Sequence, residues 1–101
     1  MASLPPLILR YSARARAHLL SIHDHLEKEG NAAAIARVGA GIREAVEILR
    51  YFPQAGRPGR IPGTREWVTR RLPYIVVYEI YPGGPGEVVI LGVFHARQAR
   101  P

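Results

Sequence analysis

The last third of the chain contains two long runs of β-branched and aromatic residues, separated by a short segment of proline and glycine. The runs are 74–80 and 88–94, and the segment between them is Pro82-Gly83-Gly84-Pro85-Gly86. Such side chains favour strands, and a Pro/Gly segment between two such runs is typical of a β-hairpin. Residues 66–69 form a shorter candidate strand, which Leu72-Pro73 ends because proline removes a ladder donor. The C-terminal third is therefore predicted to be a three-stranded meander.

The N-terminal half is predicted to form a strand followed by two helices. Residues 7–11 have the composition of a short strand, and Ser12 offers a hydroxyl that can cap a helix starting at Ala13. Two sets of apolar residues then recur at helical spacing, with Gly30 and Asn31 between them as a helix stop and a helix cap. The first set is Ala15, Leu19, Ile22 and Leu26, and the second, through about Tyr51, is Ile35, Val38, Ile42, Ala45, Val46 and Leu49. These patterns predict an antiparallel αα-hairpin.

The order strand, helix, helix and three strands is typical of an α+β domain. We expect a single domain over residues 1–101, in which the αα-hairpin packs on a mostly antiparallel four-stranded sheet that includes the N-terminal strand. The segment 53–63 contains three prolines, three glycines and two arginines and is expected to be a semi-rigid loop. Candidates for the sheet face under the helices are Val77, Leu91 and Val93, with Leu7 or Leu9, and the pattern leaves open which strand parity points inward. Tyr74 and Tyr78 share one strand face and are expected to pack there with their hydroxyls in water.

Arginine supplies nearly all of the positive charge. The 101 residues include 14 Lys+Arg against 8 Asp+Glu, a formal net charge of +6, and only Lys28 is a lysine. The planar guanidinium suits carboxylates, phosphates and aromatic faces, so an acidic protein partner and nucleic acid both fit this charge. The absence of cysteine excludes disulfides and thiolate chemistry. The apolar run 7–9 is too short for a membrane span or a signal sequence, so we expect a cytoplasmic protein without a membrane partner.

Arginines gather at the margins of the predicted meander, where only Glu66, Glu79 and Glu87 are acidic. Seven arginines in one third of the chain exceed what solubility requires, so we expect one rim of the sheet to be strongly positive. We call six of them the basic rim: Arg57, Arg60, Arg65, Arg70, Arg71 and Arg97. The seventh is Arg100. Trp67, among them, is expected either to anchor an interface or to cover the open face of the sheet, and cover is favoured.

No set of residues stands out as a metal or cofactor site. His23 and His25 are two residues apart, which turns them away from each other on a helix, and cysteine is absent. His23 is expected to be a half-buried packing residue. No serine lies in a Gly-x-Ser-x-Gly elbow. His95 follows an apolar strand and stands two residues before Arg97, where we expect either a hydrogen bond that closes the sheet or a functional group.

The order of elements and three local motifs resemble the RelE/ParE superfamily of bacterial toxins from type II toxin–antitoxin pairs. The motifs are Pro62-Gly63-Thr64-Arg65-Glu66, the Pro-Tyr-x-x-x-Tyr core at Pro73, Tyr74 and Tyr78, and the strand end His95-Ala96-Arg97. The resemblance implies the α+β fold and a cognate antitoxin, ParD-like or similar, whose disordered segment folds onto the toxin in a hetero-oligomeric complex. It implies that a groove beside the two helices, rich in small residues, receives that segment.

The superfamily contains two activities, which use different residues. RelE-like members are ribosome-dependent mRNA endonucleases that use basic residues on the middle strands, an arginine and a C-terminal tyrosine. At the corresponding positions this chain has Glu66, Val68 and Ile75, without the required charge, and it keeps a basic group only at Arg97. As an mRNA endonuclease, the alternative function, it would depend on His95 as the base, with Arg65 and Arg97 as cationic support.

These departures resemble the ParE branch, whose members poison DNA gyrase without a catalytic site of their own. By this resemblance the chain is a growth-arresting, plasmid-stabilising toxin and not an enzyme, and it needs neither a cofactor nor a metal. The basic rim, Trp67 and His95 would contact gyrase or the antitoxin. A third hypothesis is a degenerate member that binds only the antitoxin or operator DNA as a corepressor.

Overall fold

The computed structural model of the protein describes residues 5–98 and 100. Its elements are, in chain order, β1 (Ile8–Tyr11), α1 (Ala13–Lys28), α2 (Ala32–Tyr51), β2 (Arg57–Pro58), β3 (Thr64–Val68), β4 (Tyr74–Tyr81) and β5 (Glu87–His95). The predicted helices and the three C-terminal strands are therefore confirmed, with strand ends that differ by one or two residues.

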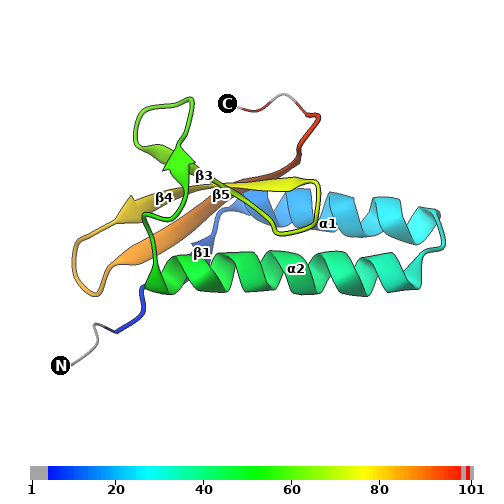
Figure 1. Ribbon diagram of the computed structural model, residues 1–101, viewed down its shortest axis with the longest axis horizontal. Coiled ribbons are helices and arrows are strands. Elements are labelled where there is room, and N and C mark those ends of the chain that lie inside the picture. The colour runs from blue at the N-terminus through cyan, green and yellow to red at the C-terminus, as the bar shows by residue number, and fades with distance from the viewer. Residues whose placement is uncertain (1–4, 99, 101) are drawn as a thin grey trace.

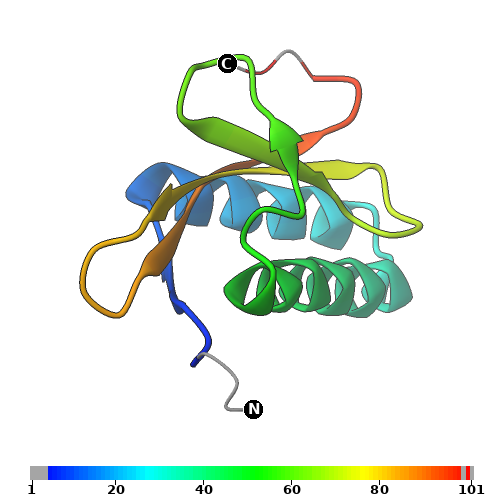
Figure 2. The same cartoon turned by 60° about the vertical axis from the view of Figure 1, so that its left-hand side comes forward.

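The strands form one sheet in the order β1-β5-β4-β3-β2, in which β1 runs parallel to β5 and the other neighbours are antiparallel. Both helices lie on one side of this sheet (Figure 1). The loop between β2 and β3 and the residues just after β5, 96–98, lie on the other side (Figure 2). We call these two sides the helix face and the outer face. The α+β architecture is the one that the sequence predicts.

The sheet has five strands, one more than predicted. The additional strand, β2, lies within the proline-rich segment 53–63, which the sequence predicts as a loop. It pairs with β3, with Arg57 opposite Glu66 and Pro58 opposite Arg65. Proline is tolerated in this position because β2 is a short edge strand, where a missing N–H need not interrupt a ladder.

Side chains cap both helices as predicted. Ser12 Oγ accepts a hydrogen bond from the Ala15 N–H at 3.0 Å, and Asn31 Oδ1 accepts one from the Ala34 N–H at 3.0 Å. Between the helices, Gly30 has a φ of +68°, a left-handed conformation that glycine adopts readily. The two apolar stripes face the core. Among the described residues, neither helix combines the length and the hydropathy that crossing a membrane requires.

A β-bulge decides which strand residues face the helices. Val77 pairs with Gly92 but Tyr78 pairs with Ile90, which leaves Leu91 as an extra residue on β5 and reverses the parity of that strand. Val93 therefore faces the helices as predicted, whereas the prediction for Leu91 is wrong. The prediction for Val77 is also wrong, because Val77 alternates with the core residues of β4. The sheet residues of the core are Tyr74, Val76, Tyr78, Val88, Ile90 and Val93, and both Leu7 and Leu9 pack against them.

The hydroxyl of Tyr78 ties the segment after α2 to the sheet. It donates to the Pro53 carbonyl at 2.6 Å and accepts from the Gly56 N–H at 3.0 Å. Tyr78 is fully buried, so the expectation that its hydroxyl lies in water is wrong. Only glycine fits at position 56, because a Cβ there would lie 2.6 Å from the Tyr78 hydroxyl oxygen. Burial raises the pKa of Tyr78, which keeps the proton that the hydroxyl donates.

The helix α1 closes the edge of β5 beyond the end of β1. Ser12 Oγ donates to the Leu91 carbonyl at 3.2 Å, and His18 Nδ1 accepts from the Val93 N–H at 3.1 Å. Burial, and to a lesser extent the nearby Arg14, lowers the pKa of His18 below 6.5. The neutral imidazole is therefore the form that caps β5. Local patterns assign His18 no such role, because Val93 lies 75 residues away in the chain.

Tyr78→Phe should destabilise the protein by about 1–3 kcal/mol, because it deprives the buried Gly56 N–H and the Pro53 carbonyl of their partner. The measurement is the free energy of unfolding in urea. Tyr81→Phe, at the exposed end of β4, is the matched control and should change that free energy by less than about 0.5 kcal/mol. A cost for Tyr78→Phe no larger than the cost of the control would contradict the role assigned to this hydroxyl.

The stability of the protein should fall as the pH drops below about 6.5, because the unfolded state, with its higher His18 pKa, takes up the proton first. Above that pH the contribution of His18 is fully present. His18→Gln, which offers an acceptor oxygen at every pH, should flatten the decline in melting temperature. His25→Gln, at an exposed position of α1, should keep the wild-type slope, and the same slope in His18→Gln would refute the assignment.

Candidate functional site

Three arginines of the basic rim bind groups within the protein. The Arg57 guanidinium contacts the Glu66 carboxylate, with an Nη2–Oε1 distance of 3.1 Å. Arg60 donates to the Arg100 carbonyl at 3.4 Å, and Arg65 donates to the Gly56 carbonyl at 2.6 Å. These three side chains brace β2, β3 and the segments around them, so their charge is partly committed to the fold.

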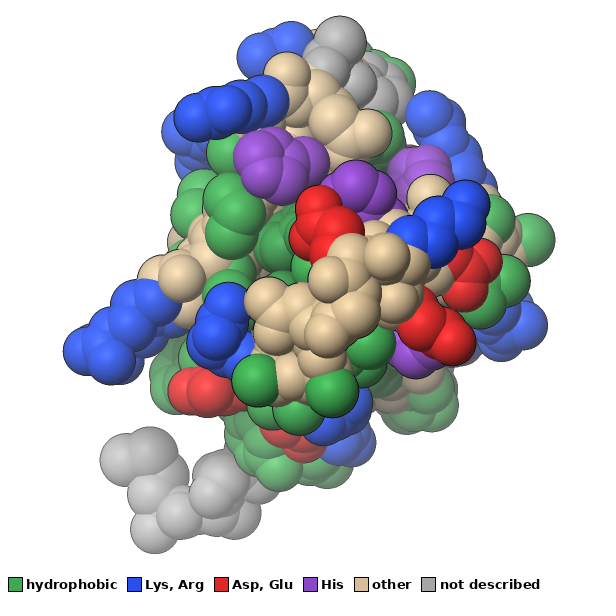
Figure 3. Space-filling view, turned by 90° about the vertical axis from the view of Figure 1, so that its right-hand side faces the viewer, with side chains coloured by type: hydrophobic (Ala, Val, Ile, Leu, Met, Phe, Trp, Pro, Cys, Tyr) green, Lys and Arg blue, Asp and Glu red, His purple; other side chains and the backbone are tan. Residues whose placement is uncertain are grey.

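The other three members of the basic rim, Arg70, Arg71 and Arg97, are exposed. Arg70 and Arg71 lie in the turn between β3 and β4, where Arg71 has a φ of 61°, and Arg97 follows β5. Figure 3 shows basic side chains at separate points around one end of the molecule, with hydrophobic and acidic side chains between them. On that face the positive charge is therefore distributed and does not form a continuous rim.

Glu66 is buried on the outer face, with 4% of its surface exposed. In addition to Arg57, Arg100 holds its carboxylate, with Nε–Oε2 and Nη2–Oε1 distances of 3.1 and 3.0 Å. The hydrogen bond from Arg100 lowers the pKa of the Glu66 carboxyl, burial acts in the opposite direction, and Arg57 lowers the pKa further. Two arginines therefore keep one buried carboxylate ionised. The sequence shows these charges but not their pairing, because Arg100 lies 34 residues from Glu66.

The residues expected to act in an mRNA endonuclease, His95, Arg65 and Arg97, do not converge on one point. His95 on β5 lies opposite Tyr74 of β4, and Arg65 on β3 lies opposite Tyr78 of the same strand. These positions are separated by about 13 Å along the strand, at about 3.3 Å per residue. The Nδ1 of His95 accepts a hydrogen bond from the Arg97 N–H at 3.1 Å. This local hydrogen bond engages one of the two ring nitrogens of His95.

Two apolar hollows flank α2 on the helix side of the molecule. The first, which we call the interhelical groove, lies between α1 and α2 and is lined mainly by aliphatic side chains. It also contains the small residues Ala36 and Gly39 and the basic side chains of His23 and Arg43. The second, the α2–β3 hollow, includes Ile48, Trp67, Val68 and Arg70. Both hollows have the composition of a surface that binds a partner.

Trp67 lies in the α2–β3 hollow and packs against the core. The expectation that it covers the open face of the sheet is wrong. Its cross-strand neighbour is Val76, a core residue, so both side chains point to the helix face. An aromatic side chain that is half-buried in a surface hollow suits the other expected role, that of an interface anchor.

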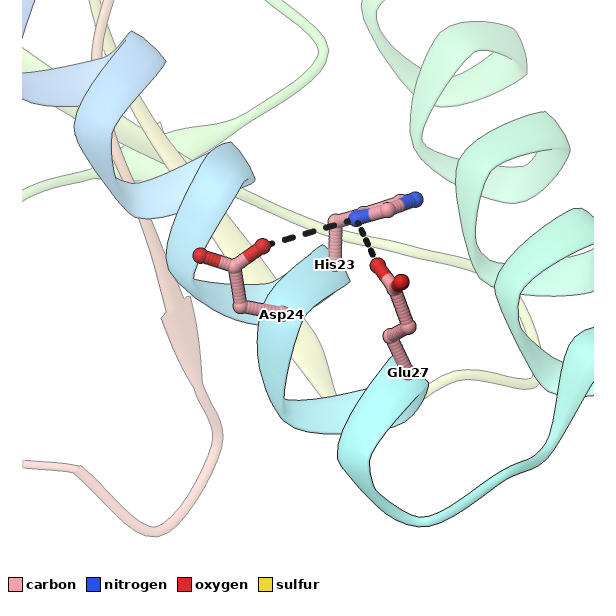
Figure 4. Close-up of side chains that lie close together, drawn as sticks. All are labelled: His23, Asp24 and Glu27. Atoms are coloured by element: carbon pink, nitrogen blue, oxygen red, sulfur yellow. Dashed lines mark ion pairs between the residues drawn. The ribbon is translucent and has the colours of Figure 1, made fainter.

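His23, Asp24 and Glu27 form an exposed cluster on α1 (Figure 4). His23 Nδ1 lies 3.7 Å from Asp24 Oδ1 and 3.5 Å from Glu27 Oε2. The expectation of a half-buried packing histidine is wrong, because His23 projects beside the apolar stripe of α1 and not from it. The candidate metal-ligand atoms of the three residues lie within 4.8 Å of one another. Their exposure and short contacts are those of surface ion pairs, which contribute little to stability.

Comparison with known proteins places this geometry in a family. The family model described as "ParE toxin of type II toxin-antitoxin system, parDE" matches residues 9–100. A relative named "Putative toxin Y4kP", from Sinorhizobium fredii, is 44% identical over 93 residues, which are 92% of each chain. A solved chain of the chromosomal ParDE toxin–antitoxin system from P. aeruginosa has a TM-score of 0.75 and 26% identity, covering 88% of this chain and 95% of that one. A chain of the toxin–antitoxin complex RelBE2 from Mycobacterium tuberculosis has a TM-score of 0.61 and 26% identity, covering 94% and 97%.

The fold and these similarities define a toxin of the RelE/ParE superfamily, as the sequence motifs imply. The likeness to both the ParDE and the RelBE2 structures shows that this arrangement of strands and helices is common to the two branches. Within the superfamily, the chain belongs to the ParE family of toxins from type II toxin–antitoxin systems.

Proposed function

We propose that this toxin arrests growth by acting on DNA gyrase and that a cognate ParD-like antitoxin neutralises it in a hetero-oligomeric complex. The observation that carries the proposal lies on β3. Where an RNA-cleaving relative is expected to present a cation, this chain has the Glu66 carboxylate, held by Arg57 and Arg100. Membership of the ParE family supports the same target.

Cleavage of RNA by its own 2′-hydroxyl requires a base for the hydroxyl proton and cations that stabilise the charge developing on the phosphate. Here His95 accepts a backbone N–H through Nδ1, and Arg65 donates to a loop carbonyl. Ile75, at a position where such an enzyme has an arginine, is buried with 5% exposure. The groups needed for cleavage are therefore absent, separated or already engaged. These facts favour an inhibitor that binds its target over an enzyme.

Contacts with gyrase would come chiefly from Arg70, Arg71 and Arg97, the exposed members of the basic rim that do not brace β2 and β3. Arg70 lines the α2–β3 hollow together with Trp67, so an arginine and an aromatic residue share this hollow. Aromatic residues and arginine contribute much of the binding free energy at protein interfaces. An anionic surface of the gyrase–DNA complex fits this combination.

The antitoxin would occupy the interhelical groove. The aliphatic lining suits the apolar face of an amphipathic segment, and Ala36 and Gly39 allow its backbone to approach closely. Arg43 and His23 can pair with acidic residues at the edges of that segment. The ParDE and RelBE2 structures, which are toxin–antitoxin assemblies by their titles, support a partner of this kind.

The purified protein, freed of antitoxin, should inhibit DNA supercoiling by gyrase and increase double-strand cleavage of plasmid DNA. It should leave mRNA in a translating extract uncut, as judged by mapping 5′ ends. The double variant Arg70→Gln/Arg71→Gln should inhibit gyrase about tenfold less, because two cationic contacts are lost. Arg10→Gln, which removes an exposed arginine paired with Glu87 at the far end of the sheet, is the matched control.

Cut mRNA with unaffected gyrase would overturn the proposal in favour of the RelE-like endonuclease. In that event His95→Ala should abolish the cleavage without unfolding the protein. Expression without growth arrest, together with the absence of both activities, would instead favour a degenerate member that binds only the antitoxin or operator DNA.

Ala36→Glu should weaken antitoxin binding about tenfold or more, because it places a carboxylate in an apolar groove, where the apolar face of the bound segment would remove the charge from water. Ala40→Glu makes the same change at an exposed position of α2 outside the groove and should bind like the wild type. Affinity is measured by calorimetric titration with the antitoxin, and melting temperatures verify that both variants are folded. Equal affinities of the two variants would place the antitoxin on another surface.

A further inference from the structure

The outer face of the sheet is apolar, and among the described residues α1 reaches it at the β5 edge, where the His18 ring packs edge-on against Phe94 and the Arg14 guanidinium lies 5.8 Å from that ring. Ile75, Val77 and Phe94 are nevertheless buried, with 5%, 4% and 7% of their surfaces exposed. The loop between β2 and β3 and residues 96–98 lie above this face (Figure 2). Ile61 of that loop lines a small hollow together with Val77, Phe94 and, from α1, Arg14. Irregular segments and the edge of α1 therefore take the place of a second helical layer.

The C-terminal tail, residues 96–98 and 100, is fixed over the outer face mainly through Arg100. The guanidinium of Arg100 makes two hydrogen bonds with the Glu66 carboxylate, and the carbonyl of Arg100 accepts one from Arg60. The side chains of Arg100 and Glu66 are 9% and 3% exposed. The ion pair is almost removed from water, where charge-assisted hydrogen bonds are strong. Closer to β5, the Ala96 N–H donates to the Pro73 carbonyl at 2.6 Å and the Gln98 N–H to the His95 carbonyl at 2.9 Å. Arg100 thus ties down the far end of the tail.

Glu66 has a second cation, because Arg57 contacts the same carboxylate from β2. Removing the sole partner of a buried charge is strongly destabilising, since the charge is left without compensation. With Arg57 in place, however, Arg100 can leave and Glu66 stays paired. Arg57 is already 59% exposed, whereas Arg100 is buried and regains hydration when it leaves. Because two arginines share one carboxylate, the tail can open at a lower cost in free energy while the sheet stays folded.

We propose that Glu66 and Arg100 form a latch that closes the C-terminal tail over the outer face and that can open as a unit. Opening frees the Arg100 guanidinium from Glu66, so that a second cation joins the already exposed Arg97 on the tail and can meet the anionic target. In the closed state the latch is an autoinhibitory contact. The autoinhibition of the toxin by its closed tail rests on the proposed action on gyrase. The existence of the latch does not depend on that action.

Hydrogen exchange at the backbone amides of the tail tests the latch in the full-length protein. Arg100→Gln should speed that exchange about tenfold, because it removes the charge-assisted hydrogen bonds. Its melting temperature should change little, since Arg57 still pairs with Glu66. Arg57→Gln should leave the tail at least as protected as in the wild type, because opening would then leave the buried Glu66 carboxylate without a cation. Glu87→Gln, which breaks the exposed pair with Arg10, is the control and should leave the tail unchanged.

A passive structural brace gives a different result. In that case Arg100→Gln and Arg57→Gln would both lower the melting temperature and speed the exchange of the tail to a similar extent. That result, or unchanged exchange in Arg100→Gln, would overturn the latch.

Glu66→Gln tests the autoinhibition by the tail, because it opens the latch and keeps Arg100. This variant should inhibit gyrase more strongly than the wild type, by a factor of about two or more, since a larger fraction of molecules has a released tail. Equal or weaker inhibition by the folded variant would overturn the inhibitory role. If the wild type itself does not inhibit gyrase, the proposed function fails, and the exchange measurements still decide whether the latch exists.

Discussion

The strand β4 is buried on both of its faces from Tyr74 to Tyr78, and the rest of the structure depends on covering both. A central strand with apolar side chains on its two sides cannot leave either side in water. The helical hairpin covers one side, over Tyr74, Val76 and Tyr78. The segment between β2 and β3 and the C-terminal tail lie over the other (Figure 1). Every candidate functional surface lies on one of these two covers or at its margin.

The two covers are stabilised in different ways. The helices bury continuous apolar stripes against the sheet. The interhelical groove is a part of their apolar surface that does not pack on the sheet. The irregular cover of the outer face has few apolar side chains, and charged contacts hold it in place. Arg57, Arg60, Arg65 and Arg100 all bind groups within this region. Half of the basic rim therefore serves the fold, and the other half lies in the turn between β3 and β4 and just after β5.

Sequence patterns predicted the features whose signals are local. The helices, the caps at Ser12 and Asn31 and the C-terminal hairpin each depend on residues close together in the chain. The bulge at Leu91 was not predictable, because it arises from how β4 and β5 align. It reverses which residues of β5 face the helices, and the alternation of apolar residues along one strand does not reveal such a change. Within the candidate site, the position of the groove beside the helices agrees with expectation. The engagement of Arg65, the side that Trp67 faces and the partners of Glu66 all depend on contacts between distant residues.

The parallel pairing of β1 with β5 joins the first strand of the chain to the last, with Leu9 opposite Val88 and Tyr11 opposite Ile90. Contacts between residues so far apart in sequence form late in folding, because a long loop must close first. During synthesis, both helices leave the ribosome before β5 exists, so their apolar stripes lack the sheet that covers them. The finished surface can arise only after β5 has been made. A ribosome that stalls before β5 would thus release a fragment without the complete surface of the toxin.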